Sequence, residues 1–144
     1  MFDLARYLPY LINRAGAKLA LAFGRELARF GVTLQEWRAL AALAAHDGQR
    51  LSDLAALTSI DGSTLSRLVQ RMRRKGLLAS APANGDSRAV QLSLTEAGRR
   101  ATRAIIPEAR RYERLALGRI APGDAALLKR LLIRVYANLE GIER

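Results

Sequence analysis

The chain has 144 residues, the usual size of one domain, which argues against a multidomain enzyme. It contains no Cys and one His, His46, which excludes disulfide scaffolds, thiolate metal sites and two-histidine metal or proton-relay sites. Its formal net charge of +11 comes from 24 Lys and Arg against 13 Asp and Glu and indicates a polyanionic partner. Genomic base composition can also enrich Arg, so the positions of the charges have to decide between these interpretations.

The chain has no segment suited to crossing or entering a membrane. Its longest strictly apolar run, residues 39–45, is far shorter than the roughly 20 residues that a membrane-spanning helix needs. The first residues also lack the charged, apolar and small-residue regions of an export signal. We therefore expect a cytoplasmic protein with no membrane partner.

The first two predicted elements are helices. Apolar residues recur at helical spacing over about residues 3–30, which predicts a long amphipathic helix that Pro9 either starts or kinks. Thr33 and Glu36 then have the spacing of a capping box, which opens a second helix running to about Ala45. The residues that this second helix is expected to bury are Trp37, Leu40, Ala41 and Ala44.

Two further helices follow, joined by a short turn. Ser52 is the expected N-cap of the third helix, and residues 59–62 form the turn before the fourth. The fourth helix begins at Ser63 and has an apolar stripe of Leu65, Leu68, Val69 and Met72. Its opposite face contains no acidic residue and consists of Ser63, Ser66, Arg67, Gln70, Arg71, Arg73 and Arg74.

The second half of the chain predicts a hairpin and two helices. Residues 77–81 and 88–94 are strand candidates, and the turn-forming residues between them indicate a β-hairpin. Thr95 caps a long Arg-rich helix through about Leu117, which Pro107 is expected to bend. An apolar helix follows within residues 119–144.

Two helices joined by a short turn, the second one basic and followed by a hairpin with a basic tip, make a winged helix-turn-helix. The fold class is therefore mainly α with a small β-hairpin wing. A major groove about 12 Å wide accepts one helix, so the fourth helix is expected to enter it. For that helix alone, a solvated basic face is the alternative interpretation, and the added hairpin favours DNA binding.

The fourth helix supplies two predicted sets of DNA contacts. The side chains expected to contact base edges are Ser63, Ser66, Arg67 and Gln70. The side chains expected to contact phosphates are Thr64, Arg71, Arg73, Arg74 and Lys75.

Short motifs in a fixed order make the chain similar, over nearly its whole length, to the MarR family of bacterial transcriptional regulators. They are Phe30-Gly31-Val32-Thr33 with Trp37-Arg38, Leu54-Ala55, residues 63–69, Lys75-Gly76-Leu77-Leu78, Asp86-Ser87-Arg88 and residues 94–98. The resemblance implies that Asp86 orients Arg88, which enters the minor groove from the wing. Residues 83–85 lack the extra charges that many members carry there.

The resemblance also implies a homodimer with N- and C-terminal dimerisation helices. Residues 1–30 and 119–144, with part of 95–118, are too apolar to be covered by a winged helix-turn-helix region at 33–94, which supports one intertwined domain. Packing of these helices on each other within one chain is the alternative. A two-fold dimer would bind a pseudo-palindromic operator with half-sites one helical turn apart, about 10 bp.

Similar proteins hold aromatic acids or related compounds between the dimer helices and the DNA-binding region. The resemblance therefore implies a small-molecule effector, such as an aromatic acid or its thioester, that releases the operator. Arg14 is the first candidate contact and Trp37 the second. An ion pair is the commoner role for such an Arg, and packing in the core is the commoner role for such a Trp.

We expect a sequence-specific regulator of transcription that binds duplex DNA, most often a repressor in similar proteins. No cofactor, metal or catalysed reaction is expected, because the sequence has no phosphate-binding loop, metal-ligand cluster or activated nucleophile. The alternative is a non-specific nucleoid-associated or RNA-binding protein, which would use the same charge without operator preference.

Overall fold

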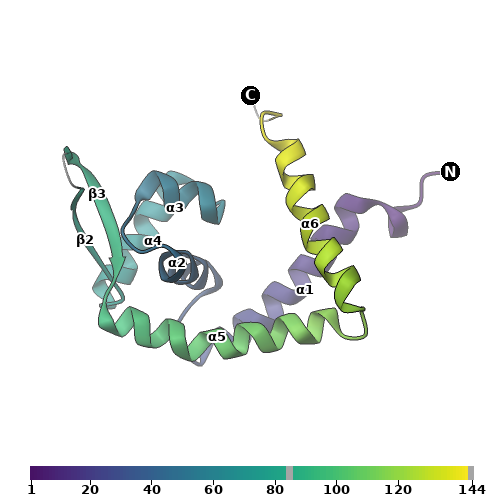
Figure 1. Ribbon diagram of the computed structural model, residues 1–144, viewed down its shortest axis with the longest axis horizontal. Helices are drawn as coiled ribbons and strands as arrows, with labels where there is room; N and C mark the ends of the chain where they lie inside the picture. Colours follow the sequence, from purple (N-terminus) through teal and green to yellow (C-terminus); the bar gives the residue numbers. More distant parts are fainter. Residues whose placement is uncertain (84–85, 143–144) are drawn as a thin grey trace. The chain divides into compact units, whose positions relative to one another are not determined.

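The computed structural model describes residues 1–83 and 86–142, and for residues 86–88 it describes the backbone alone. The described elements are η1 (Leu4–Arg6), α1 (Leu8–Ala28), α2 (Leu34–Ala45), β1 (Gln49–Arg50), α3 (Leu51–Thr58), α4 (Gly62–Arg74), β2 (Leu78–Ala83), β3 (Asp86–Leu94), α5 (Glu96–Leu117) and α6 (Pro122–Leu139) (Figure 1). They form two compact units, Met1–Arg110 and Arg111–Arg144. The predicted class, mainly α with a small β-hairpin wing, is confirmed.

The N-terminal helix starts at its proline. Tyr7 is extended between the 3-10 turn η1 and α1, and Pro9 lies in the first turn of α1. A proline there loses no helical hydrogen bond, so Pro9 starts the helix and does not kink it. The buried residues of α1 are Phe23 and Leu27, near its C-terminal end.

The predicted capping box opens α2. Thr33 Oγ1 accepts a hydrogen bond from the Glu36 amide at 3.2 Å, and Glu36 Oε2 accepts one from the Thr33 amide at 3.1 Å. The predicted buried face was partly wrong, since Trp37 is half-buried and Ala44 is exposed. The residues buried on α2 are Glu36, Ala39, Leu40, Ala42 and Leu43. The sequence predicts Glu36 only as a member of the capping box, and the structure in addition buries its side chain in the core.

The helix-turn-helix is formed by α3 and α4. Arg50 occupies the N-cap position of α3, so the predicted cap at Ser52 was wrong, because the chain enters α3 directly from the strand β1. Ser59 ends α3 in the left-handed conformation with a φ of 56°. The expected stripe of α4 is confirmed, since Leu65, Leu68, Val69 and Met72 are buried.

The wing belongs to an antiparallel sheet whose described strands have the order β1-β3-β2. The strands β2 and β3 extend further toward the hairpin tip than predicted, and Leu78 pairs with Leu94 at their base. Leu92 and Leu94 are buried, whereas Val90 is 46% exposed. Val90 lies nearer the hairpin tip than the residues of β3 that pair with β1. This position explains why its side chain is exposed, unlike those of Leu92 and Leu94.

The start of α5 is joined to the start of the wing. The Thr95 amide donates to the Leu77 carbonyl at 3.1 Å, and the Thr95 hydroxyl donates to the Gly76 carbonyl at 2.6 Å. The Gly98 amide donates to the Thr95 hydroxyl oxygen at 3.0 Å, which confirms the predicted cap. A Cβ at Gly98 would lie 2.2 Å from the Leu77 carbonyl oxygen, so this close approach requires glycine.

The second unit contains the end of α5 and all of α6. Pro122 lies in the first turn of α6, and an ion pair joins Lys129 of this helix to Glu113 of α5. None of the α6 residues is buried in the described structure, and its exposed large apolar side chains are Leu127, Leu128, Leu131, Leu132, Ile133, Tyr136 and Leu139. None of the described helices combines the length and apolar character that crossing a bilayer requires.

Candidate nucleic-acid interface

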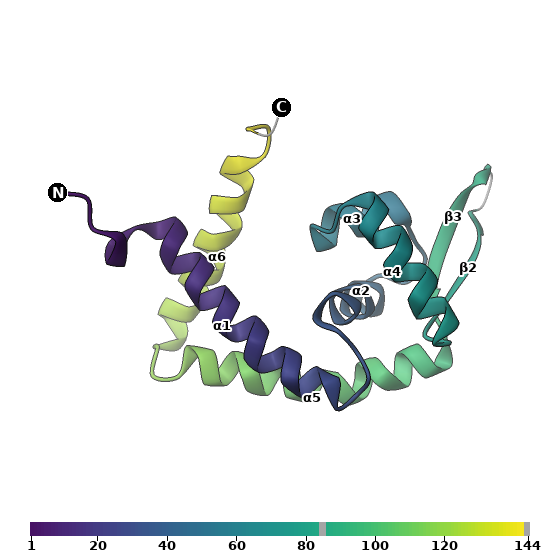
Figure 2. The same ribbon diagram turned by 180° about the vertical axis from the view of Figure 1, so that it is seen from behind.

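The outer face of α4 presents the polar and basic side chains that the sequence predicts there. Ser63, Arg67, Gln70, Arg71, Arg73, Arg74 and Lys75 are exposed, and Thr64 and Ser66 are half-buried. Figure 2 shows α4 between α2 and the root of the β2–β3 hairpin. The predicted outward orientation of this helix face is confirmed.

An open groove separates the C-terminal half of α4 from β2. It has a volume of about 640 Å³ and is lined by Gln70, Arg73, Arg74, Leu78, Ala79 and Ser80. The helix wall of this groove is polar and basic, whereas the strand wall has small or apolar side chains. The basic helix face and the wing are therefore adjacent surfaces of one unit.

Asp61 organises the N-terminal end of α4. Its carboxylate accepts hydrogen bonds from the Thr64 amide at 2.9 Å, the Thr64 hydroxyl at 2.6 Å and the Ser63 hydroxyl at 2.8 Å. Hydrogen bonds from Thr64 and Ser63 hold the pKa of Asp61 below its ordinary value. An ionised carboxylate thus adjoins the first two residues expected to contact DNA.

Glu36 has a fully buried side chain that faces the other end of α4. Its Oε1 accepts hydrogen bonds from Arg71 Nε at 3.1 Å and Lys75 Nζ at 3.0 Å, and its Oε2 accepts one from Lys75 Nζ at 2.9 Å. Lys75 Nζ also donates to the Gly31 carbonyl at 3.0 Å. One carboxylate therefore connects the α1–α2 loop, the start of α2 and the last turns of α4.

The pKa of Glu36 reflects two opposing effects. Burial raises the pKa, but the hydrogen bonds from Lys75, the Thr33 amide and Arg71 together outweigh burial and hold the pKa below its ordinary value. Glu36 is therefore ionised at neutral pH.

The cations of α4 fall into two groups. Arg71 and Lys75 are paired with Glu36, and their side chains are 47% and 37% exposed. Within the described part of the chain, no ion pair engages Arg73 or Arg74, whose side chains face solvent. The cations predicted to contact phosphates therefore differ, because Arg71 and Lys75 already have an ion-pair partner and Arg73 and Arg74 do not have one among the described residues.

The wing residues Asp86 and Arg88 lie in β3, where Asp86 pairs with Ala83. Their side chains lie outside the described part of the structure, so the predicted orientation of Arg88 by Asp86 stays a prediction.

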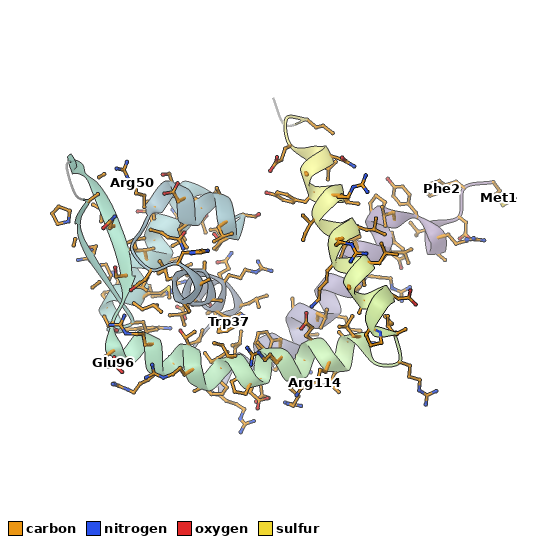
Figure 3. The ribbon with its side chains drawn as sticks, viewed as in Figure 1. Met1, Phe2, Trp37, Arg50, Glu96 and Arg114 are labelled. Carbon is orange, nitrogen blue, oxygen red and sulfur yellow. The ribbon has the colours of Figure 1, made fainter. Side chains whose placement is uncertain are left out.

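The two candidate effector contacts have different surroundings. Arg14 is exposed on α1, with its guanidinium 5.4 Å from the centre of the Tyr10 ring. Trp37 is half-buried on α2 (Figure 3), and its ring packs edge-on against Phe23 with centroids 6.1 Å apart. The structure thus gives each side chain an aromatic partner of its own and does not bring the two together.

The roles of Glu36 and Asp61 at the two ends of α4 were not predicted from the sequence. The capping-box pattern located Glu36, but no local pattern relates it to Arg71 or Lys75, which follow 35 and 39 positions later. An acidic residue just before a helix is an N-cap signal, which could have identified Asp61. No cluster of three or more potential metal ligands occurs among the described residues.

A short helix, a turn, an exposed basic helix and an adjacent hairpin define a winged helix-turn-helix protein of the DNA-binding class. The profile of the MarR family matches residues 30–89, which span the turn before α2, the helix-turn-helix and most of the hairpin.

The relatives that align with most of the chain are regulators of transcription. The transcriptional repressor NicR of Pseudomonas putida is 27% identical over 96% of this chain and 88% of its own length. The transcriptional activatory protein BadR of Rhodopseudomonas palustris is 26% identical over 98% of this chain and 83% of its own. The crystal structure of the PcaV regulator of Streptomyces coelicolor, in complex with its natural ligand, shares 26% identity and a TM-score of 0.81 over 97% of this chain and 99% of PcaV. Residues 30–89 thus match the MarR family, and over nearly its whole length the chain is similar to transcriptional regulators, which supports a DNA-binding regulatory role.

Glu36→Gln is expected to lower the free energy of unfolding at pH 7 by about 1–3 kcal/mol, because it weakens hydrogen bonds to a charged, buried acceptor. Because the pKa of Glu36 is lower in the folded state, its ionised carboxylate stabilises the fold at pH values above its unfolded-state pKa, about 4.3. This stabilisation is lost as the pH falls through the folded-state pKa. The difference between wild type and variant should therefore shrink below about pH 4.3. Urea unfolding at several pH values and one fixed protein concentration measures this difference.

Glu96→Gln is the matched control. Glu96 also faces arginines, Arg99 and Arg103, but its side chain is 62% exposed. Exposed ion pairs contribute little to stability, so this variant should stay close to wild type. An effect of Glu36→Gln that is independent of pH would contradict the expected role of the carboxylate charge.

Proposed function

We propose that the chain is a homodimeric repressor that binds a pseudo-palindromic operator and is released by a small organic acid. The observation that carries the DNA-binding part is the exposed, cation-rich face of α4 beside the β2–β3 hairpin. NicR is a repressor and BadR is an activatory protein, so both signs of regulation occur among the relatives. Repression is the simpler proposal, because a protein bound over a promoter blocks transcription without further contacts.

The proposed DNA contacts follow the position of each side chain on α4. Arg67 and Gln70, assisted by Ser63 and Ser66, contact base edges in the major groove, where an Arg fork matches guanine. Arg73 and Arg74, with Thr64, contact phosphates. The wing adds Arg88, oriented by Asp86, in the neighbouring minor groove.

Arg67→Ala and Arg74→Ala should weaken DNA binding in different ways. Loss of Arg67 should cost about 1–3 kcal/mol at the base that it contacts and relax sequence preference there. Loss of Arg74 should weaken all duplexes alike and reduce the slope of log K against log salt by about 0.9. Binding isotherms at several salt concentrations, on a duplex selected from a random pool and on a random duplex, measure both effects.

Arg25→Ala removes the same charge from an exposed site on α1, outside the proposed DNA-binding face, so it should leave the slope and the preference unchanged. Equal losses on selected and random DNA for both α4 variants would contradict their separate roles. Equal wild-type affinity for selected duplex, random duplex and structured RNA would favour the alternative, a non-specific nucleic-acid-binding protein.

The proposed homodimer follows from unusually exposed apolar helices. Large apolar side chains are exposed on the N-terminal elements, at Leu4, Leu8, Leu11 and Ile12. The helix α6 exposes seven, and patches of this kind mark protein interfaces. A two-fold partner would cover both regions and place two copies of α4 on one duplex.

Leu131→Glu in α6 should convert the dimer to a monomer and weaken operator binding by 100-fold or more (about 10²), because the two half-sites are then no longer bound together. Sedimentation velocity and operator-binding isotherms measure the two effects. Arg130→Glu changes a neighbouring exposed position by a larger charge and should leave the dimer intact. A wild-type monomer at operator-binding concentrations would contradict the proposal.

The proposed effector is an aromatic acid or its thioester. The similarity to PcaV, solved with its natural ligand, supports a small-molecule site in this chain. Arg14 would bind the acid group, since its guanidinium is exposed beside an aromatic ring. Trp37 would be a separate, half-buried contact, since the structure does not bring its side chain together with that of Arg14.

Because Trp37 is the one Trp of the chain, its fluorescence reports directly on this region. An effector acid should change that fluorescence and release a preformed protein–duplex complex over the same concentration range. Arg14→Ala should raise both midpoints by about 10-fold, the equivalent of one lost charge-assisted hydrogen bond. The uncharged amides of the same acids are the ligand control, and an unchanged midpoint in Arg14→Ala would remove this residue from the site.

A further inference from the structure

The buried carboxylate of Glu36 faces the helix that is proposed to enter the major groove, although Glu36 itself belongs to α2. It accepts three hydrogen bonds from Arg71 and Lys75, two of the cations in the C-terminal half of α4. Both cationic side chains are partly exposed, so DNA phosphates and Glu36 compete for the same donors.

The burial of Glu36 decides this competition. Its side chain has no exposure to solvent, so water cannot replace donors that leave for a phosphate. A buried carboxylate that loses its partners strongly destabilises the fold. If Arg71 and Lys75 stay paired with Glu36, the cost is small, because their remaining N–H groups face solvent and can bind water. Arg71 and Lys75 therefore remain with Glu36 while Arg73 and Arg74, which have no ion pair among the described residues, are available to phosphates.

We propose that Glu36 is a specificity-determining positioning residue that withholds Arg71 and Lys75 from the DNA backbone. This inference rests on the proposed DNA-binding face of α4. Withholding two cations lowers the sequence-independent part of the affinity, which depends on the number of phosphate contacts. The same hydrogen bonds hold α4 against the start of α2, which keeps Arg67 and Gln70 in register with base edges. Glu36 thus favours operator over random DNA by both effects.

A purely structural role for Glu36 predicts a different result. Loosening α4 would weaken binding to every duplex and leave the number of phosphate contacts the same or smaller. Release of Arg71 and Lys75 instead adds contacts, and each new contact steepens the dependence of log K on log salt by about 0.9. The salt slope therefore separates the two explanations.

The test uses Glu36→Gln in the full chain, at a temperature where circular dichroism shows it folded. Its salt slope on random duplex should steepen by about 0.9 to 1.8, for one or two added phosphate contacts. Its affinity for random duplex at low salt should rise, and the ratio of operator to random affinity should fall several-fold. Asp3→Asn is the matched control, because it removes one carboxylate charge at the N-cap of η1 and should leave the slope unchanged.

A double-mutant cycle identifies the released cations. Arg71→Ala or Lys75→Ala should leave the slope of the wild type almost unchanged but reduce that of Glu36→Gln by about 0.9 each. A folded Glu36→Gln variant whose slope is unchanged or shallower would overturn the inference while Arg74→Ala still reduces the wild-type slope. If Arg74→Ala also leaves the slope unchanged, the proposed DNA-binding face itself is wrong.

Discussion

The position of the DNA-binding helix depends on one buried carboxylate. Glu36 closes the capping box of α2 through the Thr33 amide and, with the same two oxygens, binds Arg71 and Lys75 on α4. An unpaired carboxylate in this environment would be unstable, so the start of α2 and the last turns of α4 are held together. The capping of α2 and the attachment of the last turns of α4 to it therefore depend on the same group.

Most of the fold is predictable from the sequence because its signals are local. Apolar spacing located the helices, and the residues Thr33, Thr95 and Gly76 marked their ends. The strand β1 was missed, since two residues carry no alternating pattern and pair with β3 some 40 positions away. The buried face of α2 was misplaced for a related reason, because its position depends on donors from a distant helix.

The candidate interface was likewise predictable only in part from the sequence. Helical periodicity is sufficient to predict which side chains of α4 face outward, since the apolar stripe fixes the opposite face. It is not sufficient to predict which of those cations are already paired, because Arg71 and Lys75 meet a partner far away in the sequence. Charge counted along a helix therefore overstates the charge that is free to bind a polyanion.

The absence of a side chain at Gly98 has a mechanical consequence. The Leu77 carbonyl lies directly against this glycine while accepting a hydrogen bond from the Thr95 amide, and the neighbouring Gly76 carbonyl accepts one from the Thr95 hydroxyl. The first turn of α5 and the root of β2 are thus clamped together without an intervening side chain that could rearrange. A tilt of that end of α5 would therefore move the base of the hairpin with it.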